Sequence, residues 1–355
     1  MTAHNPTPPQ PNTASVSPGF SRAAFQTEPA PVAAALLALS ELDPRHRVQL
    51  IGREQVLRDQ VQAHLAGEYA SLVSHAERID LIDASDVIEM SDRPSAVVRG
   101  KPRSSMHVGL KLQADGHSEA FVSAGNTGAQ MAISTIILRL HPNVARAAIA
   151  TVFPTAGQPI VVVDSGANVD CAAEELVQFA RLGAAYAESV LGRTNASVGL
   201  LSIGEEPEKG NAAVKEAHQL LAASGLNFHG NIEGRDLPAG ANDRGPFDVV
   251  VCDGFVGNVV LKFYEAVAPM IVGLLRERGG VDKALVASAL GHLDYSQYGG
   301  APLLGVNGIS IIAHGKSSAR ALKNAIKVAA QAAESRLDEH IGERLGEPAA
   351  PGARA

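Results

Sequence analysis

A chain of 355 residues is long enough for one large α/β unit or two lobes, and 46% hydrophobic residues with 34 glycines suit a soluble α/β enzyme. The formal charge of −7 argues against non-specific binding of nucleic acid, for which a basic excess is the usual signature. Two cysteines, Cys171 and Cys252, are too few for a disulfide framework or a multi-cysteine zinc site, which indicates a reducing cytoplasm.

The histidines form no His-x-x-x-His or His-x-His pair, so we expect no structural metal. No window holds 18 uninterrupted apolar residues, which excludes an ordinary transmembrane helix, and the N-terminus lacks the apolar core of a secretory signal. Residues 1–30 are rich in Pro, Thr, Ser and Ala and are predicted to be a disordered tail. We expect a single α/β domain over residues 31–340 and a frayed tail over residues 341–355.

The first ordered elements are predicted to be a helix from Val32, a strand over 47–52, a helix over 55–65 and a strand over 79–83. The segment 93–106 then carries four cations. It fits a solvated loop, or an anion-binding loop in which Ser104 and Ser105 supply hydroxyls and cap a helix over 107–114.

The stretch 121–129 joins the end of a buried strand to a helix over 130–140 through small polar residues. Such a turn leaves backbone N–H groups unpaired at the positive end of the helix dipole, which suits a phosphate or carboxylate. We therefore expect Ser123, Gly125, Asn126 and Thr127 to hold an anion. The alternative is an ordinary turn capped by Thr or Asn.

The same pattern of an apolar run, a polar glycine-containing loop and a helix recurs three times, with loops over residues 164–171, 204–211 and 253–258. The alternation predicts a three-layer α/β/α fold with a largely parallel sheet. Because the carboxyl ends of parallel strands bind ligands in open α/β sheets, we expect the four loops to share one cleft.

Residues 259–295 are strongly apolar at first and predict a helical hairpin. The hairpin fits a core helix or dimer interface, and also an element that lies on a membrane surface. A glycine-dense loop over 298–308, a strand over 309–313, His314 and a helix over 319–337 complete the domain.

Six motifs resemble those of the bacterial phosphate acyltransferase family of phospholipid synthesis, in the family's order between Val32 and Leu337. They are SAGNTGA at 123–129, DSGANVDC at 164–171, KGN at 209–211, CDGFVGN at 252–258, YGGAPLLG at 298–305 and HG at 314–315. That family makes acyl phosphate from acyl-[acyl carrier protein] and inorganic phosphate.

The resemblance implies a fold related to isopropylmalate dehydrogenase and phosphotransacetylase, a homodimer, and no metal or organic cofactor. It also implies a cytoplasmic protein attached peripherally to the inner face of the cell membrane, with a membrane glycerol-3-phosphate acyltransferase as the consumer of its product. In the family the first strand runs into an Ala-Met-Gly-Gly-Asp loop, and residues 15–33 contain no such loop. A catalytically impaired homologue that acts as a lipid-interaction or scaffold protein therefore stands as an alternative.

Phosphate attack on a thioester needs a held phosphate, a polarised carbonyl and a route for the leaving thiol. In that scheme Lys209 pairs with phosphate or stabilises the oxyanion, and His314 protonates the thiolate or donates to phosphate. The amides that donate to the same centre are Asn168, Asn211 and Asn258. Asp164 and Asp253 orient these donors.

Inorganic phosphate is already a nucleophile, so we expect direct displacement without an acyl-enzyme, with both cysteines as buried fillers. A nicotinamide-dependent dehydrogenase of the same broad fold is the other alternative. It requires an adenosine pocket and acidic metal ligands beside an arginine cluster, and the sequence shows neither.

Overall fold

The computed structural model describes residues 15–19, 30–277 and 295–346. Its strands are β1 Ser15–Gly19, β2 Arg47–Gly52, β3 Ile79–Asp83, β4 Ala120–Ser123, β5 Ala148–Phe153, β6 Ile160–Val163, β7 Ser197–Ser202, β8 Asn227–Glu233, β9 Ala241–Asn242, β10 Gly245–Pro246, β11 Val249–Val251, β12 Ala301–Leu304 and β13 Ile309–Ile312. Its α-helices are α1 Ala30–Glu41, α2 Glu54–Ala66, α3 Pro94–Gly100, α4 Ser105–Ala114, α5 Thr127–Ile137, α6 Ala173–Leu191, α7 Ala212–Ala222, α8 Gly254–Glu277, α10 Ala319–Glu334 and α11 Leu337–Gly346. Two 3₁₀ helices span Ala70–Arg78 and Tyr295–Tyr298.

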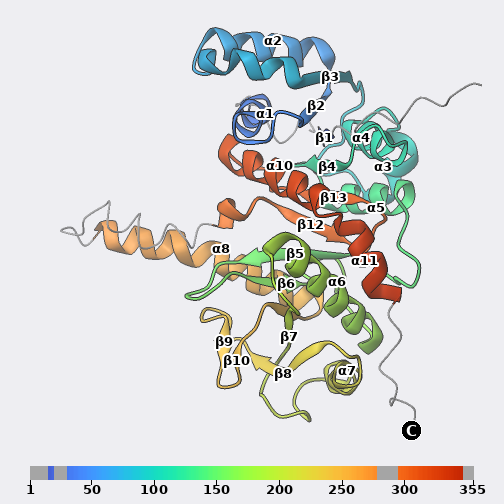
Figure 1. Cartoon of the computed structure of the whole chain (residues 1–355), viewed down its shortest axis with the longest axis vertical. Helices are drawn as coiled ribbons and strands as arrows, with labels where there is room; N and C mark the ends of the chain where they lie inside the picture. Colours follow the sequence, from blue (N-terminus) through green and yellow to red (C-terminus); the bar gives the residue numbers. More distant parts are fainter. Residues whose placement is uncertain (1–14, 20–29, 278–294, 347–355) are drawn as a thin grey trace, which may run out of the picture.

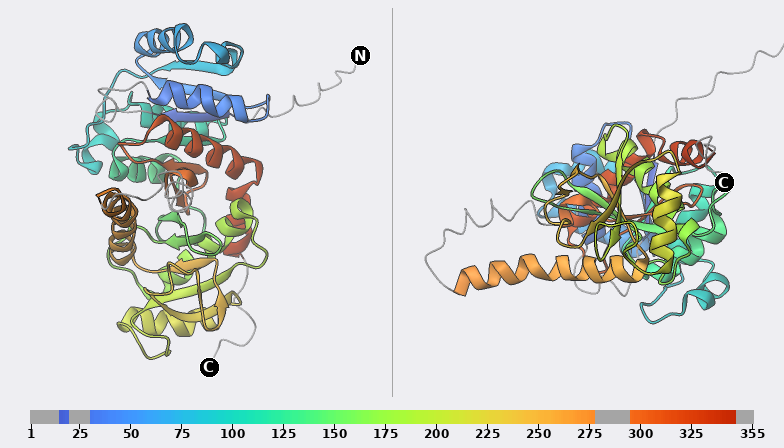
Figure 2. Two further views of the ribbon diagram at one scale, coloured as in Figure 1. Left: turned by 90° about the vertical axis from the view of Figure 1, so that its left-hand side faces the viewer. Right: turned by 90° about the horizontal axis from the view of Figure 1, so that it is seen from below.

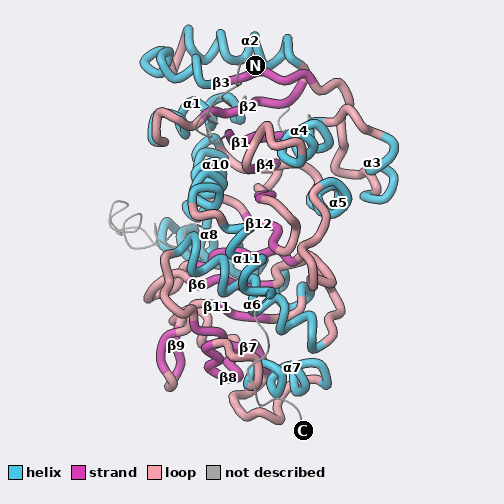
Figure 3. The backbone as a smooth tube through the Cα atoms, turned by 45° about the vertical axis from the view of Figure 1, so that its right-hand side comes forward, coloured by secondary structure: helices cyan, strands magenta, loops and turns pink. Residues whose placement is uncertain are grey.

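An eleven-stranded sheet in the order β3-β2-β1-β4-β13-β12-β5-β6-β11-β7-β8 forms the middle layer, and helices cover both of its faces (Figures 1 and 3). Most neighbours are parallel, but β12 is antiparallel to β13 and β5, and β5 is antiparallel to β6. Three reversals in succession leave the two parallel blocks, β3 to β13 and β6 to β8, running in opposite directions. The predicted three-layer α/β/α architecture with a largely parallel sheet is confirmed.

Alternating residues of each strand point to opposite faces of the sheet, which assigns each helix to a face. In β4, Ala120 and Val122 pack in the cluster that includes α10, whereas Phe121 packs in the cluster that includes α5. The α10 face also carries α1, α6 and α11, while α3, α4 and α5 cover the other face of the first block. Over the second block that other face is covered by α8.

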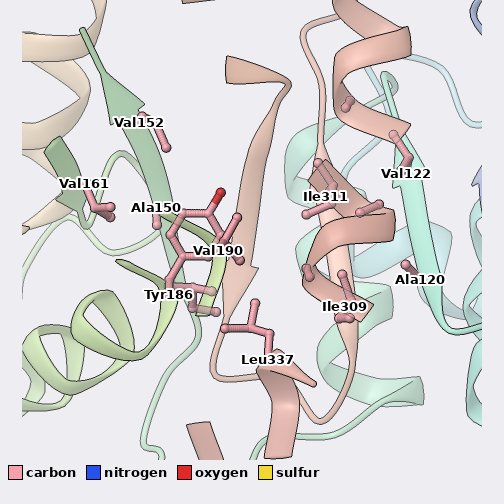
Figure 4. Close-up of a cluster of buried hydrophobic side chains, with 14 of the residues drawn as sticks. Ala120, Val122, Ala150, Val152, Val161, Tyr186, Val190, Ile309, Ile311 and Leu337 are labelled. Carbon is pink, nitrogen blue, oxygen red and sulfur yellow. The ribbon is translucent and has the colours of Figure 1, made fainter. Parts of the chain in front are cut away.

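The core is continuous across the middle of the sheet on the α10 face. Figure 4 shows Tyr186 of α6 and Leu337 of α11 packed beside Ala150 of β5 and Ile309 of β13, and all four belong to one buried cluster. Full burial of one such large apolar side chain contributes about 1.5–3 kcal/mol. The two oppositely directed blocks are therefore joined by a common core as well as by strand pairing.

The N-terminal segment differs from its prediction as a tail. Residues Ser15–Gly19 form β1, which lies inside the sheet between β2 and β4 and runs parallel to both. Its Pro18 argues against a central strand on local grounds, but pairing on two sides outweighs that preference. The remaining residues of the predicted tail lie outside the described residues.

Several other predicted boundaries shift. The predicted frayed tail begins too early, since α11 continues to Gly346 and buries Ile341 against the core. Residues 301–304, which were predicted to belong to a glycine-dense loop, form the strand β12. The strand β8 was not predicted, and it is one of the two edge strands of the sheet. Of the predicted hairpin, the structure describes the helix α8 to Glu277 and the segment from residue 295; the rest lies outside the described residues. Figure 2 shows α8 extending away from the body of the molecule.

Candidate functional site

The first crevice lies where β4 and β13 end side by side. These strands are parallel neighbours, and the helices that follow them, α5 and α10, cover opposite faces. Adjacent strands whose connections leave to opposite faces create the crevice in which open α/β sheets bind ligands. The two loops are joined directly, because the backbone N–H of Ala313 donates to the carbonyl of Ser123 at 2.8 Å.

Two of the predicted anion ligands in this crevice hold the loop itself. Ser123 is fully buried, and its Oγ accepts from the backbone N–H of Gly125 at 3.2 Å. Asn126 caps α5, since its Oδ1 accepts from the N–H of Ala129 at 3.0 Å. The Asn126 Nδ2 donates to three backbone carbonyls between Glu89 and Asp92. Both side chains therefore position the turn rather than face a ligand.

Groups that remain open at the first crevice are Thr127, His314 and Lys316, all with exposed side chains. Thr127 is the first residue of α5, where backbone N–H groups lack helical partners. The His314 Nδ1 accepts from the backbone N–H of Lys316 at 3.1 Å, which assigns the proton of the neutral ring to Nε2. The two joined loops thus carry a helix N-terminus, a hydroxyl, an imidazole N–H and an ammonium, a donor set suited to phosphate.

The cationic segment before α4 is more structured than a loop. Pro94–Gly100 is the helix α3, and the ammonium of Lys101 binds the carboxylate of Asp92. Ser104 caps α4 as predicted, accepting from the N–H of His107 at 3.4 Å. The predicted ligand Ser105 is buried in the first turn of α4.

A second crevice lies at the carboxyl ends of β6 and β11, whose following helices α6 and α8 also cover opposite faces. Its centre is the fully buried carboxylate of Asp164. Oδ1 accepts from the N–H groups of Ile149, Gly166 and Ala167 at 3.0–3.2 Å, and Oδ2 accepts from the N–H and Nδ2 of Asn168 at 2.7 and 2.9 Å. Burial raises the pKa of Asp164, and these donors oppose that rise.

Protein atoms fill the second crevice. A β-carbon on Gly254 would lie 2.8 Å from Asp164 Oδ2, and one on Gly257 would lie 1.9 Å from the Asp164 carbonyl oxygen. Asp253 caps α8 by accepting from the N–H of Val256 at 2.8 Å. Asn258 is exposed beside Gly166. Asp164 and Asn168 therefore hold the start of α8 in place.

The loop that follows β7 carries the predicted catalytic pair Lys209 and Asn211. Asn211 caps α7, accepting from the N–H of Val214 at 2.9 Å. Lys209 is exposed, and among the described residues it makes no ion pair. Its catalytic role stays a prediction.

The predicted shared cleft is wrong in one respect. The carboxyl end of β4 points in the direction opposite to the carboxyl ends of β6, β7 and β11, because the antiparallel pairings of β12 and β5 reverse the strand direction. The loop after β4 therefore lies on the opposite side of the sheet from the loops after β6, β7 and β11, beyond the other ends of the strands. Six strand spacings of about 4.8 Å each separate β4 from β7. This strand arrangement disfavours the pairing of Lys209 with a phosphate held by Thr127 of the same chain, which stays a prediction.

Neither cysteine is placed as a nucleophile. Burial raises the pKa of the Cys171 thiol to about 11, and burial also raises the pKa of Cys252. Cys252 is buried as predicted, whereas Cys171 is only partly buried against the core. Lys316 is the open cation that sequence reasoning missed, although its position two residues after His314 was a usable signal. In the described part of the chain, no three His, Cys, Asp or Glu side chains gather as metal ligands.

Comparison with known proteins provides independent evidence about the family of this chain. A family model described as "Fatty acid synthesis protein" matches residues 26–339. The chain is 43% identical over 297 residues to a phosphate acyltransferase of Desulforamulus reducens, covering 81% of this chain and 86% of the relative. It is 42% identical over 318 residues to a phosphate acyltransferase of Thermodesulfovibrio yellowstonii, covering 84% and 90%.

Among solved structures, a phosphotransacetylase from Streptococcus pyogenes is similar with a TM-score of 0.60 and 18% sequence identity, covering 91% of this chain and 94% of that one. At that identity the similarity concerns the fold, and it confirms the predicted phosphotransacetylase-like architecture. The family match covers most of the chain and agrees with the motifs on both crevices. The chain therefore belongs to the phosphate acyltransferase family and is an acyltransferase.

Proposed function

We propose that this protein transfers the acyl group of acyl-[acyl carrier protein] to inorganic phosphate, for phosphatidic acid and phospholipid synthesis. The observation that carries the proposal is the hydrogen-bonded pair of loops after β4 and β13. They carry the exposed Thr127 at the N-terminus of α5 and the exposed His314 and Lys316. Family membership supports an acyl donor and a phosphate acceptor in general. The carrier-protein donor rests on the motif resemblance.

In this mechanism the N-terminus of α5 and Lys316 hold the phosphate dianion. One phosphate oxygen attacks the thioester carbonyl carbon, so a carbon–oxygen bond forms while the carbon–sulfur bond breaks. The sulfur leaves with the bonding electrons as a thiolate, to which the Nε2–H of His314 donates a hydrogen bond, and it takes its proton from water. Displacement is direct, because inorganic phosphate is itself a nucleophile, and the raised pKa of the Cys171 thiol disfavours that side chain as an alternative.

We further propose a homodimer formed through α8. Its exposed apolar side chains Phe255, Val259 and Phe263 recur every four residues and form one row along the helix. The row continues to Met270 and Leu274 where the helix leaves the body, and this outer part suits the interface of a membrane. The proposal places the protein in the cytoplasm, at the inner face of the cell membrane, where a membrane glycerol-3-phosphate acyltransferase takes up the acyl phosphate.

Acyl phosphate formation from palmitoyl-[acyl carrier protein] and phosphate, trapped as the hydroxamate, tests the activity. We expect His314→Gln to lower kcat/KM by roughly 100-fold or more, the scale for a lost transition-state donor. The control is His117→Gln, at an exposed histidine before β4. No phosphate-dependent product from the folded wild-type chain would favour the impaired homologue. Loss of activity in Lys209→Ala together with full activity in His314→Gln would assign the reaction to the loop after β7 instead of the loops after β4 and β13.

A further inference from the structure

A cavity of about 390 Å³ lies beside the edge strand β8, outside both crevices. It is lined by Pro207, His218, Phe228, His229, Gly230 and Arg244. None of these residues is acidic, although the chain as a whole is negatively charged. The volume lies at the lower end of the range for small-molecule sites, about 300–1,000 Å³.

The guanidinium of Arg244 is held across the β8 backbone. Its Nη1 donates to the carbonyl of His229 at 2.8 Å, and its backbone N–H donates to Asn242 Oδ1 at 3.0 Å. A β-carbon on Gly230 would lie 2.1 Å from Nη1, and Gly230 has a φ of +86°, so only glycine suits this position. Among the described residues no carboxylate pairs with Arg244. Its other N–H groups are therefore available to a ligand.

The imidazole of His218 is oriented by a buried amide. Asn231 is fully buried, and its Nδ2 donates to the carbonyl of Glu206 at 2.8 Å. Its Oδ1 therefore accepts from Nδ1 of His218, at 2.9 Å. The ring also meets the ring of Phe228 edge-on at a centroid distance of 5.2 Å. This leaves Nε2 of His218 as the ring nitrogen free for the cavity.

A second imidazole in the cavity wall has an unused polar atom. Nδ1 of His229 is buried and has no hydrogen-bond partner among the described residues. A buried polar atom without a partner costs about 1–3 kcal/mol. A turn of the His229 ring that brings this nitrogen to a ligand in the cavity therefore gains affinity. The cavity thus combines a fixed guanidinium and two imidazoles with the apolar surfaces of Phe228 and Pro207.

The geometry points to a binding site for the phosphate group of a small organic phosphate ester. Arg244 donates to the phosphate oxygens, and a guanidinium matches phosphate in planar, paired hydrogen bonds. Because Asn231 holds the Nδ1 proton of His218, this ring donates from Nε2 as the imidazolium, a form that the charge of a bound phosphate favours. Phe228 and Pro207 contact the organic part, for which the cavity volume leaves room. The site is separate from the acceptor-phosphate crevice, since β8 closes the opposite end of the sheet.

Calorimetric titration of the full-length protein tests the assignment with phenyl phosphate, inorganic phosphate and phenol as probes. We expect phenyl phosphate to bind at least about tenfold more tightly than inorganic phosphate, and phenol not to bind. Arg244→Gln and His218→Gln each weaken binding by about tenfold or more. Arg235→Gln is the matched control, because Arg235 is a nearby exposed arginine that is paired with Glu233.

His314→Gln separates this site from the acceptor crevice and leaves phenyl phosphate binding unchanged. In histidine-selective NMR spectra, the imidazole signals of His218 and His229 shift on addition of the probe. Equal binding by wild type and Arg244→Gln, both folded by circular dichroism, would overturn the assignment. So would binding that is lost in His314→Gln and kept in Arg244→Gln, because the probe would then occupy the acceptor crevice.

Discussion

The carbonyl oxygen of Asp164 lies 1.9 Å from the point that a β-carbon on Gly257 would occupy. This contact seats the first turn of α8 on the loop that follows β6. We expect Gly257→Ala to lower the free energy of unfolding by about 3 kcal/mol, because the backbone of that loop must move. Urea unfolding measures the change.

Gly273→Ala in the same helix is the matched control for that substitution. No atom lies within 4 Å of its added β-carbon, so alanine should raise stability by about 0.5–1 kcal/mol through helix propensity alone. Equal urea midpoints for the two variants would show that the start of α8 is not held tightly by the Asp164 loop.

The partly buried thiol of Cys171 is expected to react slowly. With a pKa of about 11, it is thiolate to only about one part in a thousand at pH 8. Iodoacetamide should modify it roughly 100-fold more slowly than it modifies the same cysteine in the unfolded chain. Mass spectrometry of the modified peptide, in buffer and in urea, gives both rates. Rapid alkylation in the native state would support a mechanism with an acyl-enzyme on Cys171, and so would loss of acyl transfer in Cys171→Ala.

The row of apolar side chains on α8 predicts how the protein associates. Phe263 is 68% exposed and lies in the middle of the row. We expect Phe263→Glu to convert the dimer into a monomer, since it places a charge in an apolar interface. Sedimentation velocity measures the mass in solution. Lys262→Glu adds negative charge one residue away, off the row, and should leave the dimer intact; a monomeric wild type would contradict the proposal.

Glu41 joins α1 to α10 through two ion pairs, with Lys323 at 2.7 Å and Lys327 at 2.6 Å. Hydrogen bonds from these two lysines lower the pKa of Glu41 below its usual 4.5. A lowered folded-state pKa contributes stability above the unfolded value, and that contribution is lost as the pH falls through the folded value.

We therefore expect Glu41→Gln to lower the free energy of unfolding at pH 7 by about 0.2–1 kcal/mol, the scale for a partly exposed pair. The difference between this variant and wild type should shrink as the pH falls below 4.5 and through the lower folded-state pKa, since both proteins then carry a neutral side chain. Thermal unfolding across this pH range measures it. A constant difference at every pH would assign the effect to packing instead of charge.

Much of the fold follows from apolar runs that end at glycine or aspartate, and the predicted bounds of β2 and β3 match the structure. Other features depend on partners far away in the chain. β1 contains proline and polar residues, and β12 follows two glycines with positive φ, so neither has a local strand pattern. The direction of each strand also has no local signature in the sequence. The two parallel blocks run in opposite directions because β12 and β5 pair in antiparallel fashion with their neighbours.

The sequence predicted which polar residues lie in the loops of the candidate site, but it did not predict what their side chains bind. Asn126 and Asp164 are the polar residues expected of ligand loops, yet their side chains are used by the loops themselves. Their partners include carbonyls 34–37 residues away for Asn126 and an N–H 15 residues away for Asp164. Such pairings follow from the folded sheet and cannot be read from sequence spacing.

The place of β13 between β4 and β12 has a consequence for synthesis. β4 ends at Ser123, but its neighbour Ile309–Ile312 is made almost two hundred residues later. Until then a nascent chain exposes one unpaired edge of β4, with an apolar face on each side. The two blocks cannot join into one sheet before residue 312 has left the ribosome. A high share of such distant pairings slows folding, so this chain should depend on chaperones during translation more than a protein whose strands pair in sequence order.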